Sequence, residues 1–160
     1  MNPSAKISII GAGNVGGIAA MRLAQEGLGD ILLVDAVKGL AQGKAFDLED
    51  AAPLLKYNYN IQGTGDINEI KDSDIIVITA GLTRKPGMTR EDLLNRNTQI
   101  LKDICLNIKN LAPNSILIVV TNPLDLMTRL ALKITGFQPN KVLGMGITLD
   151  AARFSNLISK

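Results

Sequence analysis

A glycine-rich turn gives this sequence its first recognisable chemistry. The turn follows a short apolar run and has the pattern Gly-x-Gly-x-x-Gly, formed by Gly11, Ala12, Gly13, Asn14, Val15 and Gly16. Gly11 permits a tight turn, Gly13 lets a diphosphate approach the backbone, and Gly16 lets the following helix pack closely against the strand. The N-terminus of such a helix offers unpaired N–H groups and a partial positive charge to phosphates.

An aspartate at the end of the next apolar run completes this pattern. Asp35 lies about 20 residues after the turn, where a carboxylate can accept hydrogen bonds from both hydroxyls of a ribose. The same carboxylate repels a 2′-phosphate, so the pattern predicts a dinucleotide site that prefers NAD to NADP. On this motif alone, a flavin or another adenosine cofactor stays open. A structural glycine turn beside a surface aspartate is the simpler alternative.

Three arginines could bind a substrate that carries carboxylates, namely Arg84, Arg90 and Arg153. A guanidinium stays charged at neutral pH and forms a two-pronged hydrogen-bonded pair with a carboxylate. Taken without their context, arginines on loops and at helix starts are usually solvated surface residues. The sequence contains no histidine, although histidine is the side chain that most often exchanges protons near pH 7.

The hydrophobic pattern predicts the strands and helices that position these residues. Buried strands are predicted at residues 7–10, 30–35, 60–65, 74–79, 115–120 and 141–143. Helices are predicted at residues 14–28, 38–52, 89–111, 122–136 and 149–158, and a loop at residues 81–89. Pro53 is expected to end the second helix, and Asn122 is expected to cap the fourth, with Pro123 at its first position.

This alternation of strands and helices predicts an α/β fold. Short links and near-continuous apolar strands indicate a parallel sheet with helices on both faces. We predict a Rossmann-type, doubly wound parallel sheet of six strands in the order 3-2-1-4-5-6.

Composition excludes several classes of protein. With 160 residues, of which 46% are hydrophobic and 20% charged, the chain is large enough to fold around a core. The net charge is +2 and the basic residues are scattered, so nucleic-acid binding has no support. No apolar run reaches the roughly 20 residues that span a bilayer, and no signal-peptide pattern is present. Cys105 is expected to be a small core residue, no metal site is predicted, and the expected compartment is the cytoplasm.

Five segments, in this order, resemble the lactate/malate dehydrogenase family: GAGNVG, LLVDAVKGLAQGKAFDLEDAAP, VITAGLTRKPGMTREDLLNRN, VVTNPLDLMT and GMGITLDAARF. The similarity covers residues 5–158 and is greatest to the lactate-dehydrogenase-like malate dehydrogenases of bacteria. The resemblance implies NAD as cofactor and a small dicarboxylate, malate or oxaloacetate, as substrate. It further implies reversible oxidation of malate by the complete enzyme, a step of the tricarboxylic acid cycle.

The resemblance also implies roles for single residues. Arg84 would discriminate between substrates, Arg90 would polarise the carbonyl that is reduced, and Arg153 would hold the C1 carboxylate. Oxaloacetate has two carboxylates and suits two fixed cations, whereas pyruvate would leave Arg84 without a partner. Asn122 would contact both the substrate and the nicotinamide ribose. Besides the glycine turn and Asp35, the other cofactor contacts would be Thr79, Ala80, Gly81, Asn97, Val120 and Thr121.

The missing histidine shapes the remaining expectations. Asp150 matches the acid that orients the family's catalytic histidine, which would lie downstream, so Asp150 is expected to be unpartnered and either solvated or capping its own helix.

We expect an NAD-binding domain at residues 1–147 and the start of a truncated substrate domain at residues 148–160, inactive alone. The alternatives are a stand-alone, non-catalytic NAD-binding or assembly module and a fragment of a lactate dehydrogenase. The helix at residues 38–52 resembles the family's dimer interface, so the complete enzyme is expected to be a homo-oligomer, either a dimer or a tetramer.

Overall fold

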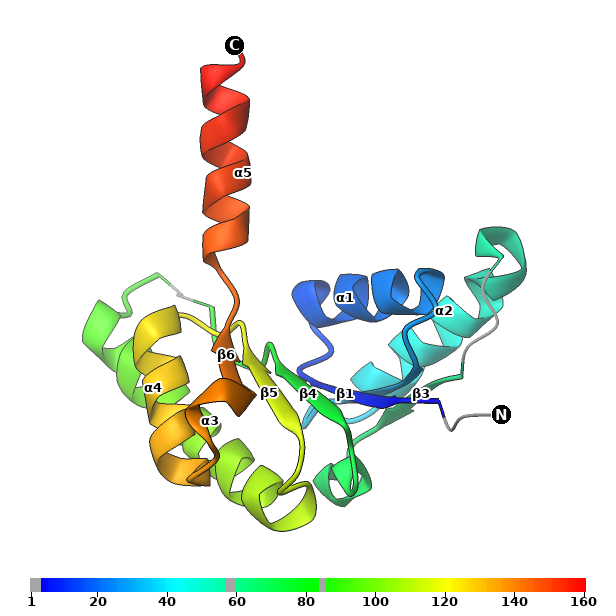
Figure 1. The fold of residues 1–160 in the computed structure, drawn as a ribbon, viewed down its shortest axis with the longest axis horizontal. Coiled ribbons are helices and arrows are strands. Elements are labelled where there is room, and N and C mark those ends of the chain that lie inside the picture. The colour runs from blue at the N-terminus through cyan, green and yellow to red at the C-terminus, as the bar shows by residue number, and fades with distance from the viewer. Residues whose placement is uncertain (1–3, 57–59, 84–85) are drawn as a thin grey trace.

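The fold is a single parallel sheet with helices on both of its faces (Figure 1). The computed structural model describes residues 4–56, 60–83 and 86–160, and the side chain of Arg90 also lies outside this description. The strands are β1 (Lys6–Ile10), β2 (Asp30–Val34), β3 (Ile61–Thr64), β4 (Ile75–Ile78), β5 (Ile116–Val119) and β6 (Val142–Gly144). The helices are α1 (Asn14–Gln25), α2 (Leu40–Leu55), α3 (Arg90–Leu111), α4 (Leu124–Thr135) and α5 (Ile147–Ile158), with short 3-10 helices η1 (Ile67–Ile70) and η2 (Pro139–Lys141).

The strand order is β3-β2-β1-β4-β5-β6, and every neighbouring pair is parallel. This result confirms the predicted Rossmann-type sheet. The order reverses between β1 and β4, and in open α/β sheets ligands bind at the carboxyl ends of the strands beside this reversal. The glycine turn follows β1 and Thr79 follows β4, so the topology brings these two segments together at the reversal.

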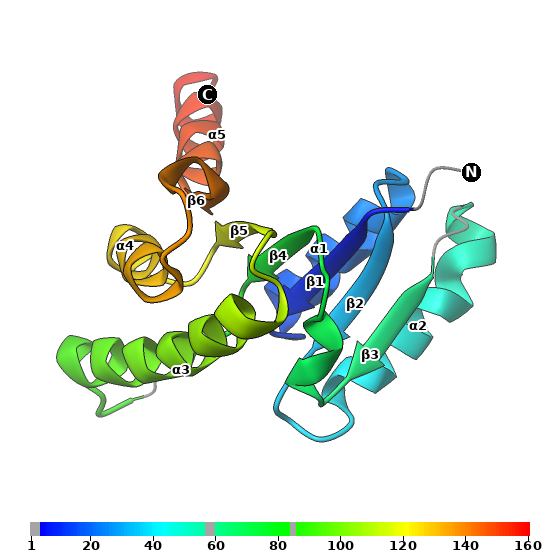
Figure 2. The same ribbon diagram turned by 60° about the horizontal axis from the view of Figure 1, so that its bottom comes forward.

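Two separate apolar cores lie on the two sides of the sheet. Successive strand residues point to opposite faces, so Ile9 and Leu33 pack with α1 and α2, while Ile10 and Val34 pack with the layer of α3 and α4. Both layers can be followed in Figure 2. The side of α1 and α2 that faces the sheet is lined with small residues, which lets both helices approach the strands closely: Ala20, Ala24, Ala41 and Ala45.

Helix α2 corrects the expectation that Pro53 ends the second helix. The helix continues through Pro53 to Leu55 and ends at Lys56, which has a left-handed conformation with φ of 57°. A proline loses its own hydrogen bond to the preceding turn, but it leaves later amides free to bond. The N–H of Lys56 accordingly donates to the carbonyl of Ala52, and the last turn closes.

The start of α4 also differs from the prediction. The helix begins at Leu124, Pro123 occupies the cap position with φ of −72° and ψ of 121°, and no side chain caps it. The backbone of Pro123 is therefore extended rather than helical, which leaves Asn122 one residue outside the helix. Asn122 is not the cap that the sequence predicted. Gly136 ends α4 in a left-handed conformation with φ of 69°, as predicted.

Helix α5 extends away from the sheet toward the C-terminus (Figure 1). Every residue of this helix is exposed, including large apolar side chains such as Ile147 at 83% and Leu157 at 70%. Among the described residues, no helix has both the length and the apolar character needed to cross a bilayer.

Cys105 lies on α3 inside the core, as predicted, and is fully buried. Burial raises the pKa of its thiol from an ordinary 9.0 to about 12, because the thiolate loses its hydration. Unfolding therefore favours deprotonation above pH 9. We expect the free energy of unfolding to be independent of this thiol below pH 9 and to fall as the pH rises from 9 toward 12. Urea titrations of the wild-type chain and of Cys105→Ala across this range will measure the effect, and parallel pH profiles for the two proteins will contradict it.

Candidate functional site

The glycine turn is shaped by three glycines that have different environments. Gly11 has φ of +109°, and a Cβ there would lie 2.6 Å from the backbone nitrogen of Ala80. A Cβ at Gly16 would lie 1.9 Å from the carbonyl oxygen of Gly11. At Gly13, in contrast, a Cβ would meet no heavy atom within 4 Å. Packing within the chain therefore requires Gly11 and Gly16 to be glycine, but it does not require this of Gly13.

Hydrogen bonds attach the turn to the neighbouring strand ends. The N–H of Gly11 donates to the carbonyl oxygen of Val34 at 2.8 Å, and the N–H of Ala80 donates to that of Ile10 at 2.8 Å. The hydroxyl of Thr79 donates to the carbonyl oxygen of Gly11 at 2.9 Å. The turn is thus fixed to both β2 and the segment after β4. The second half of the turn, where α1 begins, is exposed to solvent at Gly13, Asn14 and Val15.

Asp35 lies beside this turn, and its carboxylate accepts two backbone hydrogen bonds. Its Oδ2 accepts from the N–H of Ala12 at 2.7 Å, and its Oδ1 accepts from the N–H of Val37 at 2.9 Å. A carboxylate offers about four lone-pair positions, so both oxygens of Asp35 can still accept hydroxyl groups. The side chain is only partly buried and faces a cavity.

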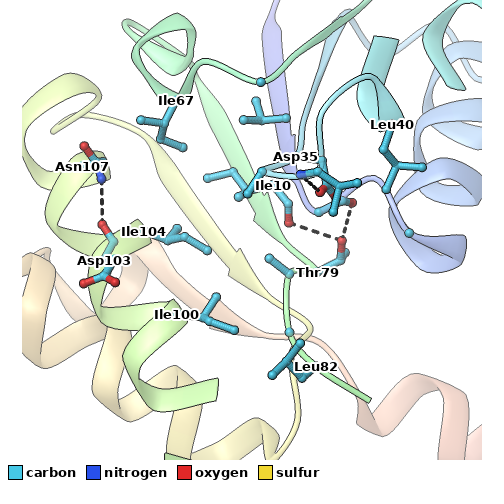
Figure 3. A pocket seen from close by; sticks show the side chains of 18 residues that line it. Ile10, Asp35, Leu40, Ile67, Thr79, Leu82, Ile100, Asp103, Ile104 and Asn107 are labelled. Carbon is cyan, nitrogen blue, oxygen red and sulfur yellow. Dashed lines mark hydrogen bonds between the residues drawn. The ribbon is translucent and has the colours of Figure 1, made fainter. Parts of the chain in front are cut away.

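The cavity has a volume of about 540 Å³ and opens at the sheet reversal (Figure 3). Its volume lies in the usual range for small-molecule and cofactor sites. Apolar side chains from several elements form much of its wall: Leu40, Ile67, Leu82, Ile100 and Ile104. Asp103 and Asn107 of α3 also line it. The sequence alone does not indicate that these residues line a cavity, because periodicity shows only that α3 has an apolar face.

Several of the predicted cofactor residues line this cavity together. They are Gly11, Gly13, Asp35, Thr79, Ala80 and Gly81. No protein atom requires residue 13 to be glycine, so the space beside its backbone on the cavity wall is free. A diphosphate that lies against the backbone needs this free space. An apolar cavity beside a carboxylate likewise suits an adenosine. The residues present therefore fit a dinucleotide.

Asn97 holds the backbone around the cavity. It is 3% exposed, and its Oδ1 accepts from the N–H of Leu82 at 2.8 Å. Its Nδ2 donates to the carbonyl oxygens of Leu82 and Asn122, both at 3.4 Å. These contacts supply the hydrogen-bond reason that an amide on an apolar helix face needs. Thr121 lies next to them, and its hydroxyl donates to the carbonyl oxygen of Ala80 at 2.7 Å.

The remaining predicted residues lie elsewhere. Val120 and the exposed Asn122 follow β5, outside the cavity lining. Arg84 and the side chain of Arg90 are outside the described residues. Helix α3 does begin as predicted, because the hydroxyl of Thr89 accepts from the N–H of Asp92 while the Asp92 carboxylate accepts from the N–H of Thr89. The hydroxyl and the backbone N–H of Thr89 both donate to the Asp92 carboxylate, and these two hydrogen bonds lower the pKa of Asp92.

Asp150 and Arg153 lie on α5 and not on the wall of the cavity. Asp150 is solvated, as expected, but it is not unpartnered. Nη1 of Arg153 donates to Oδ1 of Asp150 at 3.1 Å, because residues three apart lie on the same side of a helix. The side chain of Asp150 is 78% exposed and that of Arg153 is 66% exposed. Water therefore screens this pair, and its contribution to stability is small. Among the described residues, no three histidine, cysteine, aspartate or glutamate side chains are grouped to hold a metal ion.

Comparison with known proteins identifies the family of this chain. Residues 5–144 match the model of the lactate/malate dehydrogenase NAD binding domain. A malate dehydrogenase of Methanosarcina barkeri is 53% identical over 156 residues, which are 98% of this chain and 51% of that protein. The chain therefore spans about half the length of the curated relatives it matches.

Solved structures agree with this comparison. The apo malate dehydrogenase of Picrophilus torridus superposes with a TM-score of 0.93 at 44% identity, covering 98% of this chain and 50% of that one. A lactate dehydrogenase of Cryptosporidium parvum, complexed with lactic acid and nicotinamide adenine dinucleotide, superposes with a TM-score of 0.85 at 36% identity, covering 91% of this chain and 46% of that one. The chain accordingly belongs to the lactate/malate dehydrogenase family and carries that family's NAD-binding domain.

Proposed function

We propose that this chain is the cofactor domain of an NAD-dependent malate dehydrogenase. The open position at Gly13, on the wall of an apolar cavity beside Asp35, is the observation that carries this proposal. Bound NAD would supply the hydride acceptor for C2 of malate, while the protein supplies geometry and charge. Relatives at 52–53% identity that are named malate dehydrogenases favour this function over that of a lactate dehydrogenase.

We assign the substrate-binding roles by family resemblance. Arg84 and Arg153 would each pair with a carboxylate of the substrate, and Arg90 would polarise its carbonyl. Asn122 would contact both the substrate and the nicotinamide ribose. Asp150 would orient a histidine supplied by a region outside these 160 residues. The salt bridge between Asp150 and Arg153 would then break so that each residue could bind these partners. Little stability would be lost, because the pair is highly exposed.

A domain boundary near residue 147 accords with these roles. We propose that residues 1–147 form the NAD-binding domain and that residues 148–160 begin the substrate domain. Support comes from α5, which stands away from both apolar cores and contributes no buried side chain. The family model also ends close to this point, at residue 144.

NAD is expected to bind this chain more tightly than NADP. Asp35 would accept hydrogen bonds from the ribose hydroxyls and repel an added 2′-phosphate. We expect a preference of at least tenfold, or about 1.4 kcal/mol, and a smaller preference in Asp35→Ala. Titration calorimetry with both cofactors measures this preference. Asp125→Ala is the matched control, because it removes an exposed carboxylate from α4, away from the cavity. Equal affinities of the unmutated chain for NAD and NADP would overturn the assignment of Asp35.

We also propose that the complete protein is a homo-oligomer, and that the chain itself associates at high concentration. Exposed apolar side chains on α2 support the first statement, including Phe46 at 65% and Leu54 at 84%, and those on α5, such as Phe154 at 65%, support association of the chain itself. Contiguous apolar patches on a surface mark interaction sites, and exposed side chains on one helix can form such a patch. Sedimentation velocity across a range of concentrations should show species larger than the 17.1 kDa monomer. A clean monomer at high concentration will contradict the proposal.

A further inference from the structure

The carboxylate of Asp35 connects two loops that a dinucleotide would contact separately. One of its oxygens holds the N–H of Ala12 in the glycine turn, and the other holds the N–H of Val37 in the loop after β2. Asp35 is itself fixed, because its own N–H donates to the carbonyl oxygen of Thr64 at 3.1 Å. The side chain therefore bridges the turn that would cradle phosphate and the loop beside the adenosine.

We propose that Asp35 is a positioning residue for the phosphate-binding turn, in addition to its role toward the ribose. This inference rests on the proposed dinucleotide site, but it concerns a different part of the cofactor. It predicts that removal of the carboxylate weakens binding of the diphosphate even when the ligand has no ribose hydroxyls for Asp35 to hold.

Burial of the turn makes this bridge necessary. Ala12 has no exposed surface, and the Asp35 carboxylate is the acceptor of its N–H. A buried donor without an acceptor is costly, so a chain that lacks the carboxylate satisfies this donor by admitting water beside the turn or by shifting the turn. Ala12 lies between Gly11, which is packed against Ala80, and Gly13, whose backbone faces the cavity. A shift at Ala12 therefore moves the backbone that would contact the diphosphate.

The two roles do not compete for the same lone pairs. Each carboxylate oxygen has about two acceptor positions, and the backbone uses one on each oxygen. One position on each oxygen stays available for a ribose hydroxyl. The backbone hydrogen bonds also fix the orientation of the carboxylate before a ligand arrives, which lowers the entropic cost of binding.

An NAD analogue that lacks both hydroxyls of the adenosine ribose separates the two roles. Affinities of NAD and of this 2′,3′-dideoxy analogue are measured by calorimetry for the wild-type chain, Asp35→Ala, Asp35→Asn and the control Asp125→Ala. We expect Asp35→Ala to bind the analogue about tenfold more weakly than the wild type does, which corresponds to one hydrogen bond to a charged group. Asp35→Asn keeps only one oxygen and should be intermediate, and Asp125→Ala should match the wild type.

Each result has a distinct meaning. If Asp35→Ala weakens NAD but binds the analogue as the wild type does, the positioning role is wrong and only the ribose role stands. If Asp35→Ala changes the affinity for neither ligand, the proposed role of Asp35 toward the ribose is wrong as well.

Amide hydrogen exchange in the ligand-free chains supplies a second readout. The Ala12 amide should exchange faster in Asp35→Ala than in the wild type, while the amides of the β5 strand stay protected. Unchanged exchange at Ala12 overturns the inference, and a uniform rise in exchange over the whole chain assigns the effect to general destabilisation instead.

Discussion

Gly13→Val is expected to abolish measurable NAD binding while the chain stays folded. The backbone at Gly13 has φ of −67° and ψ of −165°, an extended conformation with negative φ that does not require glycine. A Cβ there meets no heavy atom within 4 Å, so the valine side chain would enter the space that we assign to the diphosphate. We expect a loss of affinity of at least ~100-fold, on the order of 3 kcal/mol. Calorimetric titration with NAD and a thermal unfolding curve measure the two effects.

Gly16→Ala is the matched comparison, because it should do the reverse. Its Cβ would overlap the carbonyl oxygen of Gly11, so the helix must move away from the strand. Overpacking of this kind costs about 1–3 kcal/mol, which urea denaturation resolves easily. If Gly13→Val keeps the wild-type affinity for NAD, or unfolds as readily as Gly16→Ala, the cradle has been misassigned.

The second large effect is an expected absence of activity: this 160-residue chain should not turn over malate. Hydride transfer from an alcohol leaves a proton for a nearby base, and a positioned base is typically worth about 10²- to 10⁴-fold in rate. The chain contains no histidine. Asp150 is 78% exposed and paired with Arg153, so neither geometry nor desolvation prepares it for proton transfer.

NADH formation from L-malate at saturating NAD will test this expectation, provided that the preparation is free of host dehydrogenase. Addition of a histidine-containing C-terminal half from a related malate dehydrogenase serves as the positive control. A rate for the chain alone in the usual range of enzymes, roughly 1 to 10³ per second, would show that another residue acts as the base.

Much of the fold could be predicted because its signals are local. Continuous apolar runs determine the buried parallel strands, and the sheet order follows from the general rules for doubly wound folds. Two predictions were wrong, the end of α2 and the cap of α4, and both concern prolines. A proline signals a break in the helical pattern, but whether the helix ends depends on the amides that follow Pro53 or on the backbone angles adopted at Pro123.

The site could be predicted only where its residues are close in sequence. The glycine turn and Asp35 form a local pattern, and the structure brings them together. The three backbone contacts of Asn97 reach from α3 to Leu82 and Asn122, and no sequence spacing indicates them. The salt bridge of Asp150 has a local i, i+3 spacing, so the sequence could have indicated Arg153 as its partner.

The central position of β1 has a consequence for synthesis on the ribosome. Ile7 pairs with Ile31 on one side and with Ile75 on the other, so β1 needs a partner that is made much later. Long-range parallel pairings of this kind slow folding, because a large loop must close before the contact forms. Until β4 emerges, one edge of β1 stays open, and nascent chains would be exposed to edge-to-edge pairing during this interval.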